Sequence, residues 1–589
     1  MANPSRFSDR LIGCPLFKPG LAQPGLRLSY PPNNHKTTAD RIFLIGTAPA
    51  ATEVTVNGQR IGDRSPAGHF APSIPLQVGK NTLVIKAGSQ TISLQVERSQ
   101  ASAPPPTGLG FGKDSLTPAV NISWLPNEPI YLEAIASPQA QISAQLGTAS
   151  LALQPLSQSV NLPANAAALI GNNQPVVDRL AGVFKGCTAI ATPGNLGQPR
   201  YQLSLRGQTL AQTAPGQITI LNPAQFAIVE VTPELGGTAR TGPSTDYSRL
   251  TPLPPGTRAR VTAQAGEWLR LDYGGWIRQA ETRPLAMNAP VESIIRSLSS
   301  RQVPGWTEVR LPLEMPMPLM VDQGEQTFTL TLYNTTAQTD LIRLDDDPVI
   351  QRLDWQQVAP GQVQYRFNLK SRQQWGYKLR YEGATLVLSL RHPPALSSQG
   401  PSLQGMTILL DPGHGGPIDA GSVGSTGYPE KSATLLVGKL LEQELSQRGA
   451  KVVMTRNEDV DLDLPPRVAL INQTEPAIAL SLHFNALPDN GDALRTKGIG
   501  AFWYQGQSHD LALFLQNYLV THLNRPAYGL FWNNLALTRP TVAPAVLLEL
   551  GFMINPEEFE WISDPKAQQG LAKTLADGIT EWFRLVVIS

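Results

Sequence analysis

Cysteine, charged residues and long apolar segments are all scarce in this sequence. It has two cysteines, Cys14 and Cys187, in different expected domains, so nothing supports a shared disulfide. Charged residues make up 16%, and 47 Lys and Arg against 46 Asp and Glu leave a net charge of +1. This near-neutral balance argues against a nucleic-acid ligand, which requires a basic excess. No apolar run approaches the ~18 residues that would predict a transmembrane segment.

The N-terminal segment also lacks the apolar stretch of a secretory signal. Leu11–Cys14 resembles the lipobox of bacterial lipoproteins, but the preceding Asn3–Arg10 is polar, which favours coincidence. Without a periodic pattern, residues 1–36 are predicted to be extended or disordered. A start assigned too far downstream would also explain the missing signal.

Length and punctuation predict several domains, because a single core stops growing near ~250–300 residues and the chain has 589. Most of the 52 prolines and 50 glycines punctuate the region before Gln404, where they predict short strands joined by turns. We expect a β-sandwich at 37–98, a linker at 99–114, a second β-rich domain at 115–220, a small barrel at 222–284, another β-rich domain at 295–393 and a linker at 394–402. The sandwiches resemble bacterial Ig-like modules, and the domain at 295–393 resembles β-rich envelope-targeting modules.

The barrel prediction depends on glycines and tryptophans between residues 240 and 277. The sequence contains Arg240–Pro243, the turn Pro254–Gly256, and two tryptophans, Trp268 two positions after a glycine and Trp276 directly after one. A strongly bent small barrel needs glycines at its corners and aromatic side chains in its core. The segment resembles a bacterial SH3-like domain. Two roles remain equally open for it: binding of cell-wall peptide, or a spacer whose tryptophans only form the core.

The pattern changes after Gln404, where strands alternate with amphipathic helices. This alternation predicts an α/β domain at 403–588 with a mostly parallel central sheet flanked by helices. We expect strands at 406–410, 451–455, 477–482, 499–504, 535–538 and 545–550, and helices at 432–448, 465–473, 508–523 and 566–583.

Two histidines and two glutamates of this domain carry the predicted chemistry. His414 follows the first strand in a glycine-rich loop, His483 ends a later strand, and Glu430 opens the first helix. Ligands gather at the carboxyl ends of parallel strands, so these side chains are expected to meet there. Two imidazoles and one carboxylate leave a zinc position open for water, and a separate carboxylate can move its proton. Glu549, within the apolar strand at 545–550, is the candidate because an unpaired buried charge is costly.

These motifs, D-P-G-H-G-G, E-K, S-L-H-F-N-A and L-L-E-L-G-F, resemble the zinc-dependent N-acetylmuramoyl-L-alanine amidases in the same order. The resemblance covers about residues 403–588. It implies one zinc ion held by His414, Glu430 and His483, with Glu549 as the catalytic acid/base. It also implies peptidoglycan as substrate and cleavage between N-acetylmuramic acid and L-alanine, hence a periplasmic or cell-envelope location.

Secondary candidates surround this set. Asp411 either orients His414 or caps its own turn, and Arg467 and Asn485 are substrate-site or supporting candidates. Phe484 is expected to shape the rim. Only residues 486–497 separate the His483 strand from the next, which is too short for the plugging insertion of some amidases. We therefore expect a site that its own chain does not block.

Purely structural explanations also exist for some of these residues. His509 and His522 are too far apart on one helix to share a metal. A structural zinc prefers four ligands, usually including cysteine, and this domain has none. The rivals are a non-catalytic wall-binding scaffold with a decayed amidase domain and a zinc peptidase acting on the stem peptide. The sequence does not indicate an oligomeric state.

Overall fold

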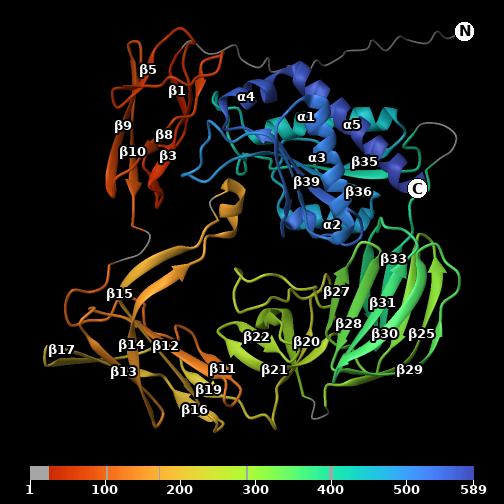
Figure 1. Cartoon of the computed structure of the whole chain (residues 1–589). Coiled ribbons are helices and arrows are strands. Elements are labelled where there is room, and N and C mark those ends of the chain that lie inside the picture. Colours follow the sequence, from red (N-terminus) through yellow and green to blue (C-terminus); the bar gives the residue numbers. More distant parts are fainter. Residues whose placement is uncertain (1–24, 101–103, 172, 287–289, 397–401, 589) are drawn as a thin grey trace, which may run out of the picture.

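The computed structural model describes residues 25–100, 104–171, 173–286, 290–396 and 402–588. β modules occupy the chain up to about residue 396, and an α/β domain follows (Figure 1), as the sequence predicts. Cys14 and the lipobox-like Leu11–Cys14 lie outside the described residues, and Cys187 is exposed as a free thiol. Among the described helices, none combines the length and apolar character needed to cross a membrane.

The first module is a small set of β-sheets packed around one core. Its strands are β1 (Arg27–Tyr30), β2 (His35–Thr37), β3 (Arg41–Phe43), β4 (Ile45–Thr47), β5 (Val54–Val56), β6 (Gln59–Arg60), β7 (His69–Phe70), β8 (Ser73–Pro75), β9 (Gly79–Ala87) and β10 (Gln90–Arg98). They form sheets in the orders β1-β4-β7, β2-β10-β9-β5-β6 and β3-β8. The extended segment predicted up to residue 36 is wrong from residue 27 onward. Leu26, Leu28 and Tyr30 alternate along β1 and pack on the core, a pattern that is too short to stand out in the sequence.

The next two predicted domains share a sheet. Their strands are β11 (Ile122–Trp124), β12 (Pro129–Ile135), β13 (Gln141–Leu146), β14 (Ala149–Asn161), β15 (Val176–Ala189), β16 (Gly194–Gly197), β17 (Arg200–Leu205), β18 (Gln208–Thr213), β19 (Ile218–Ile220), β20 (Ile228–Val231), β21 (Arg258–Ala265), β22 (Trp268–Leu271), β23 (Trp276–Arg278) and β24 (Thr282–Leu285), with 3₁₀ turns η1 (Asn165–Ile170) and η2 (Gln279–Glu281). One sheet has the order β12-β15-β14-β13-β17-β18. The other runs β16-β19-β11-β21-β20-β24, so strands on both sides of residue 221 pair within it.

The last β module is a two-layered sandwich ahead of the α/β domain. Its strands are β25 (Ser293–Val303), β26 (Trp306–Pro312), β27 (Leu319–Gln323), β28 (Thr327–Tyr333), β29 (Thr335–Arg343), β30 (Ile350–Ala359), β31 (Gln362–Leu369), β32 (Tyr377–Glu382) and β33 (Thr385–Arg391). The two sheets, β29-β25-β26-β33-β32 and β27-β28-β31-β30, enclose a core that includes Phe328, Phe367 and Leu388.

The α/β domain contains a six-stranded sheet in the order β35-β34-β36-β39-β37-β38. Its strands are β34 (Thr407–Pro412), β35 (Lys451–Met454), β36 (Ile478–Asn485), β37 (Ile499–Trp503), β38 (Ala527–Trp532) and β39 (Ala545–Phe552); its helices are α1 (Glu430–Gln447), α2 (Leu464–Thr474), α3 (His509–Leu523), α4 (Pro556–Ser563) and α5 (Pro565–Ile588), with 3₁₀ turns η3 (Gly506–Ser508) and η4 (Ala536–Thr538). Four strands, β35, β34, β36 and β39, run parallel, and β37 and β38 run in the opposite direction. The mostly parallel sheet is therefore confirmed.

Alternating side chains along these strands give the sheet two apolar faces. Ile408 and Leu410 pack with helices α1, α3 and α5, whereas Leu409 packs with α2 and η4 on the other face. One strand prediction is wrong: residues 536–538 form η4, and the edge strand is β38 instead. Gly529 interrupts the pattern of β38, so its apolar alternation is not visible in the sequence.

The first module packs directly on the α/β domain (Figure 1). Phe43 and Ile45 form a buried cluster with Phe552 and Ile554 at the carboxyl end of β39. Polar contacts surround this cluster: His35 Nε2 lies 2.9 Å from Asp489 Oδ2, and Tyr30 donates its hydroxyl to the same carboxylate. The first and last modules therefore share an interface, although they lie at opposite ends of the sequence.

Candidate metal centre

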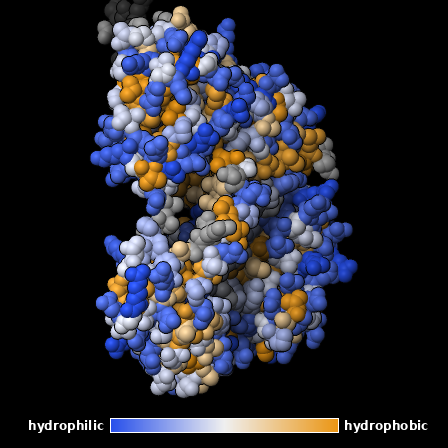
Figure 2. Space-filling model, turned by 60° about the vertical axis from the view of Figure 1, so that its left-hand side comes forward, coloured by the Kyte–Doolittle hydropathy of each residue, from blue (hydrophilic) through white to orange (hydrophobic). Residues whose placement is uncertain are grey.

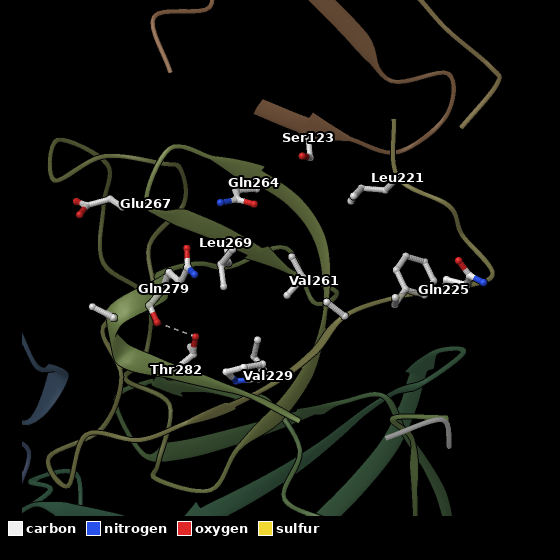
Figure 3. A pocket seen from close by; sticks show the side chains of 14 residues that line it. Ser123, Leu221, Gln225, Val229, Val261, Gln264, Glu267, Leu269, Gln279 and Thr282 are labelled. Atoms are coloured by element: carbon white, nitrogen blue, oxygen red, sulfur yellow. Dashed lines mark hydrogen bonds between the residues drawn. The ribbon is translucent and has the colours of Figure 1, made fainter. Parts of the chain in front are cut away.

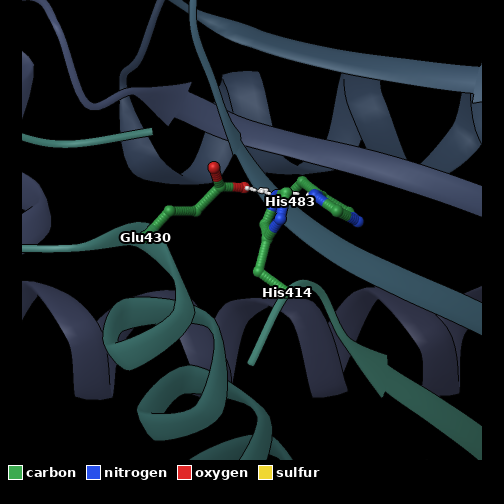
Figure 4. A group of neighbouring side chains, drawn as sticks. All are labelled: His414, Glu430 and His483. Atoms are coloured by element: carbon green, nitrogen blue, oxygen red, sulfur yellow. Dashed lines mark hydrogen bonds and ion pairs between the residues drawn. The ribbon is translucent and has the colours of Figure 1, made fainter. Parts of the chain in front are cut away.

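Three side chains meet at the carboxyl edge of the parallel sheet. His414 follows β34, His483 lies near the end of β36, and Glu430 is the first residue of α1. His414 Nε2 lies 3.2 Å and His483 Nδ1 3.1 Å from the same atom, Glu430 Oε1 (Figure 4). One donor atom from each residue lies within 4.8 Å of the others. The structure therefore brings together the three residues that the sequence analysis selected, with their donor atoms facing one point.

Backbone geometry makes this convergence possible. His414 has φ of 60°, which turns its side chain back from the end of β34 toward the neighbouring strand. Gly413 lies directly beneath the His483 ring, where an added Cβ would come within 2.2 Å of the ring carbon Cε1. A side chain at position 413 would therefore displace the second imidazole.

Glu430 is buried and held by hydrogen bonds on both oxygens. Its Oε2 accepts from the backbone N–H and the hydroxyl of Ser422, and its Oε1 accepts from Phe484 N–H. Burial favours the neutral carboxyl, but the hydrogen bonds and charges of His414 and His483 outweigh it and lower the pKa of Glu430. Glu430 is therefore an anion, as a metal ligand must be.

Asp419 was not among the residues predicted from the sequence. Its Oδ1 lies 2.7 Å from His414 Nδ1, so that nitrogen carries the donated proton and Nε2 faces Glu430. Although burial disfavours the charged ring, the hydrogen bonds and charges of Glu430 and Asp419 raise the pKa of His414. A carboxylate on the far nitrogen of a ligand histidine fixes its tautomer and raises its basicity. The only feature of the sequence that could have predicted this contact is that an acidic residue lies five positions after the histidine.

Asp411 is linked to His414 through Arg467 rather than by a direct hydrogen bond. Its carboxylate accepts hydrogen bonds from Arg467 Nη1 at 2.8 Å, from Ser481 Oγ at 2.6 Å and from Thr455 Oγ1 at 2.6 Å. Within the described part of the chain it makes no hydrogen bond to His414. Arg467 in turn donates from Nη2 to His414 O at 2.8 Å. Asp411 therefore fixes Arg467, and Arg467 fixes the backbone that carries His414.

Arg456 supports the same loop from the other side. Its guanidinium donates to the carbonyls of Pro412, Gly413 and Lys431 at 2.9, 2.9 and 2.8 Å. Two buried arginines therefore satisfy consecutive carbonyls around the first histidine, where no regular secondary structure does so.

Glu549 lies next to His483 on the adjacent parallel strand. The two residues are paired in register between β36 and β39. Glu549 Oε2 is buried without a hydrogen-bond partner among the described residues. Burial, reinforced by the charge of Glu430, raises the pKa of Glu549 well above its ordinary value. A carboxyl group that is poised to hold a proton beside a cluster of metal-type ligands is typical of general acid/base catalysis.

The remaining predicted residues have lesser roles. Asn485 turns back on its own backbone, where its Oδ1 accepts from Ala486 N–H. The prediction that Phe484 shapes the rim is wrong, because alternation along β36 directs it into the core when His483 faces the site. His509 and His522 both lie in α3, away from the three donors. Residues 486–498, all described, form turns without a helix, so this segment carries no helical plug.

A cavity of about 190 Å³ opens beside the donors. Its lining includes His414 and His483, the acidic Asp419 and Asp461, and the apolar Leu464 and Leu537. Ile418 on the rim is 87% exposed. The cavity therefore offers apolar and polar contacts within reach of the imidazoles.

A parallel α/β sheet with two imidazoles, one anionic carboxylate and a glutamate of raised pKa at one edge is the kind of site found in metal-dependent hydrolases. The family model for N-acetylmuramoyl-L-alanine amidase matches residues 408–581. The germination-specific N-acetylmuramoyl-L-alanine amidase of Bacillus subtilis is 34% identical over 198 residues, which is 31% of this chain and 81% of that protein. The probable cell wall amidase LytH of Staphylococcus aureus is 35% identical over 183 residues, or 31% of this chain and 60% of that protein.

Two solved structures are also similar to part of the chain. The catalytic domain of CwlV, an N-acetylmuramoyl-L-alanine amidase from Bacillus (Paenibacillus) polymyxa var. colistinus, is 30% identical with a TM-score of 0.29, covering 30% of this chain and 98% of that one. An N-acetylmuramoyl-L-alanine amidase from Clostridium difficile 630 is 31% identical with a TM-score of 0.29, covering 30% of this chain and 97% of that one. The chain belongs to the N-acetylmuramoyl-L-alanine amidases. It is accordingly a peptidoglycan hydrolase.

Proposed function

We propose that the chain hydrolyses the amide between N-acetylmuramic acid and L-alanine with one zinc ion held by His414, Glu430 and His483. The observation that supports this most directly is the convergence of three donor atoms within 4.8 Å. Two imidazoles and one carboxylate form the donor set of hydrolytic zinc sites, which leave one position open. The family is generally zinc-dependent, and the donor chemistry of this site fits that metal.

Zinc, when bound, supplies Lewis acidity and lowers the pKa of water to about 7. The residues of the chain then supply orientation and proton transfer. Asp419 keeps the proton of His414 on Nδ1, so Nε2 stays free for the metal. Arg467 holds the carbonyl of His414 and thereby the direction of the ring. The anionic state of Glu430 in the absence of metal keeps this ligand ready to bind.

Glu549 is proposed as the general acid/base. It takes the proton of the water as the oxygen bonds to the carbonyl carbon, and it gives that proton to the alanine nitrogen as the C–N bond breaks. The charge of a bound zinc ion would favour the carboxylate form of Glu549 that takes the proton. The buried, unpartnered Oε2 and the raised pKa then favour holding that proton until the second step.

The test is digestion of purified peptidoglycan by the zinc-loaded full chain, with mass analysis of the products, beside Glu549→Ala. Intact stem peptides with an N-terminal L-alanine, absent with the variant, are expected. Cleavage within the stem peptide would instead indicate a zinc peptidase. Zinc binding without products from either protein would favour a non-catalytic scaffold.

The β modules are proposed to be Ig-like at 37–98 and 115–220, SH3-like at 222–284 and envelope-targeting-like at 295–393, serving localisation or wall binding. A cavity of about 740 Å³ lies between the SH3-like strands and residues 221–227 (Figure 3). Leu269, Val261 and Val229 line it together with the amides of Gln264 and Gln279. Apart from Glu267, the lining is uncharged, and a cavity of this kind suits a peptide better than an acidic polymer. Binding of stem peptide by the catalytically inactive Glu549→Ala chain, lost in Leu269→Asp, is the expected result.

The substrate lies outside the cytoplasm, so a periplasmic location is proposed. A fusion at Met1 that remained wholly cytoplasmic would contradict export from this start.

A further inference from the structure

A long β-hairpin of the second module reaches the α/β domain. Strands β14 and β15 pair with β13 and β12 near their base, but beyond the pair Leu156–Val183 they pair only with each other. The outer part is thus a two-stranded ribbon ending in η1, and it extends across the gap between the lower β modules and the α/β domain (Figure 1). Such a ribbon is marginally stable by itself, so its position depends on what its tip contacts.

The tip contacts Tyr528 of β38. The Tyr528 hydroxyl donates to the carbonyl of Leu169 in η1. The ring of Tyr528 packs edge-on against Phe552 at a centroid distance of 4.8 Å and joins the cluster that buries Phe43 of the first module. Three separate parts of the chain, namely the first module, the hairpin and the α/β domain, therefore meet at one tyrosine.

This meeting point lies beside the proposed acid/base. The Tyr528 ring covers Gly500, where an added Cβ would lie 3.0 Å from Tyr528 Cδ1, and Gly500 is paired in register with Glu549. The charge of Glu549 adds to burial in raising the pKa of Tyr528 to about 12, which agrees with this proximity. The hairpin tip therefore lies on the side of the candidate metal centre where Glu549 is.

The ribbon is also unusually apolar for an exposed arm. Val160, Val176 and Val177 are 60%, 57% and 62% exposed, and Leu162 beside them is 78% exposed. The surface turned toward the viewer in Figure 2 is hollowed between its upper and lower halves, with hydrophobic side chains gathered there. Beyond the pair Leu156–Val183 the two strands pair with each other, and the Tyr528 hydroxyl joins the tip to the α/β domain, so losing that hydrogen bond should loosen the tip.

We propose that the hairpin tip is a wall of the substrate cleft that selects substrates by size. With the tip on Tyr528, a small soluble muramyl peptide enters between the wall and the imidazoles. An intact peptidoglycan layer, whose strands extend past the scissile bond in several directions, requires the tip to leave Tyr528. This inference rests on the proposed function and specifies which form of peptidoglycan the resting enzyme cleaves.

The test compares the zinc-loaded full chain with two variants on two substrates. In the first variant, Asn-Gly replaces residues 162–175, which joins the paired residues Asn161 and Val176 by a two-residue hairpin turn. The second is Tyr528→Phe, which keeps the ring and removes the donor. The substrates are intact insoluble peptidoglycan and a soluble disaccharide carrying one stem peptide. Tyr504→Phe is the matched control, because its hydroxyl also donates to a carbonyl of another module, that of Arg249, away from Glu549.

We expect the ratio of rates on intact over soluble substrate to rise about tenfold with the shortened hairpin, and about fivefold with Tyr528→Phe, the factor for one lost hydrogen bond. Tyr504→Phe should leave the ratio unchanged. An unchanged ratio in both hairpin variants, or equal losses on both substrates, would overturn the proposal. No product from either substrate with any protein would overturn the proposed function and this inference with it.

A measurement independent of activity completes the test. Amide hydrogen exchange at residues 165–170 should be faster in Tyr528→Phe than in the wild type and in Tyr504→Phe. Equal exchange in all three proteins would show that Tyr528 does not hold the tip, and would overturn the proposal even if the variants fold normally.

Discussion

Glu549 pairs in register with His483 on the neighbouring parallel strand, so a carboxyl group of raised pKa and a ligand-type imidazole lie side by side. The charge of Glu430 contributes to this protonation, after burial. One glutamate therefore belongs to the proposed metal site and, through its charge, adds to the raised pKa of the other. Two carboxyl groups with opposite shifts are the arrangement that separates a ligand from a general acid/base.

Glu549→Gln should abolish cleavage while leaving zinc binding intact. Loss of general acid/base catalysis typically costs a factor of about 10²–10⁴ in rate. Because the variant also removes a desolvated carboxyl, its melting temperature should equal or exceed that of the wild type. Product analysis, metal content and thermal unfolding would check this. Glu557→Gln, at an exposed glutamate paired with Lys497, is the control. Loss of zinc from Glu549→Gln would contradict the assigned role.

Removing zinc should stop the reaction and lower the melting temperature. Ligand binding at about 100 times the dissociation constant stabilises a fold by about 2.7 kcal/mol. A chelator should therefore abolish both activity and this stabilisation, and added zinc should restore both. His483→Ala should behave as the chelated protein does. His522→Ala, at an exposed residue of α3, should behave as the wild type. Full activity in a metal-free preparation would refute the metal proposal.

Arg467→Lys should weaken zinc binding about 10- to 100-fold, the usual effect of losing support behind a ligand. Lysine cannot donate simultaneously to Asp411, Pro412 O and His414 O as the guanidinium does. Competition titration with a zinc-binding dye would measure the change. Arg372→Lys, at an exposed pair with Glu325, is the control. Unchanged zinc affinity would show that Arg467 only stabilises the fold.

The interface of the first module should weaken in acid. Burial disfavours ionised Asp489, but hydrogen bonds from Thr37, Tyr30 and His35 outweigh it and lower the pKa. A lowered pKa contributes stability that is present above the ordinary aspartate pKa of about 3.9. This stability is lost as the pH falls through the pKa that Asp489 has in the folded protein. Hydrogen exchange of residues 27–30 should therefore accelerate below about pH 4.

Asp489→Asn tests this cause. At pH 7 it should speed exchange at residues 27–30 relative to the wild type, and the difference should disappear in acid once both side chains are neutral. Asp492→Asn in the same loop is the control. A difference between Asp489→Asn and the wild type that persisted in acid would assign the effect to shape rather than charge.

The sequence predicted the α/β domain and the three converging donors because both depend on local patterns. Strand ends, a glycine-rich loop and a helix start are readable in order, and parallel strands bring their carboxyl ends together. Asp419 and the actual partners of Asp411 were not predictable in this way. They depend on how the loop after His414 folds back against α2 and β35, which no periodicity encodes.

In the β modules, the strands were predictable but their arrangement was not. Their strands were predictable from alternation and turns, but the shared sheet of β11 and β21 joins residues more than a hundred positions apart, and nothing local specifies such pairing. The same holds for Tyr528, which lies in a segment where the sequence predicted no strand. Its importance comes from the hairpin tip, a segment that the sequence places in another domain.

Because the first and last modules share an interface, the covalent linker at residues 99–114 is not the only connection that holds the first module. A protease cut there would leave the first module in place, because Phe43, Ile45 and the contacts to Asp489 would still hold it. The linker then acts mainly by raising the local concentration of one surface near the other. A nicked molecule would migrate as two fragments under denaturing conditions and as one particle in native buffer.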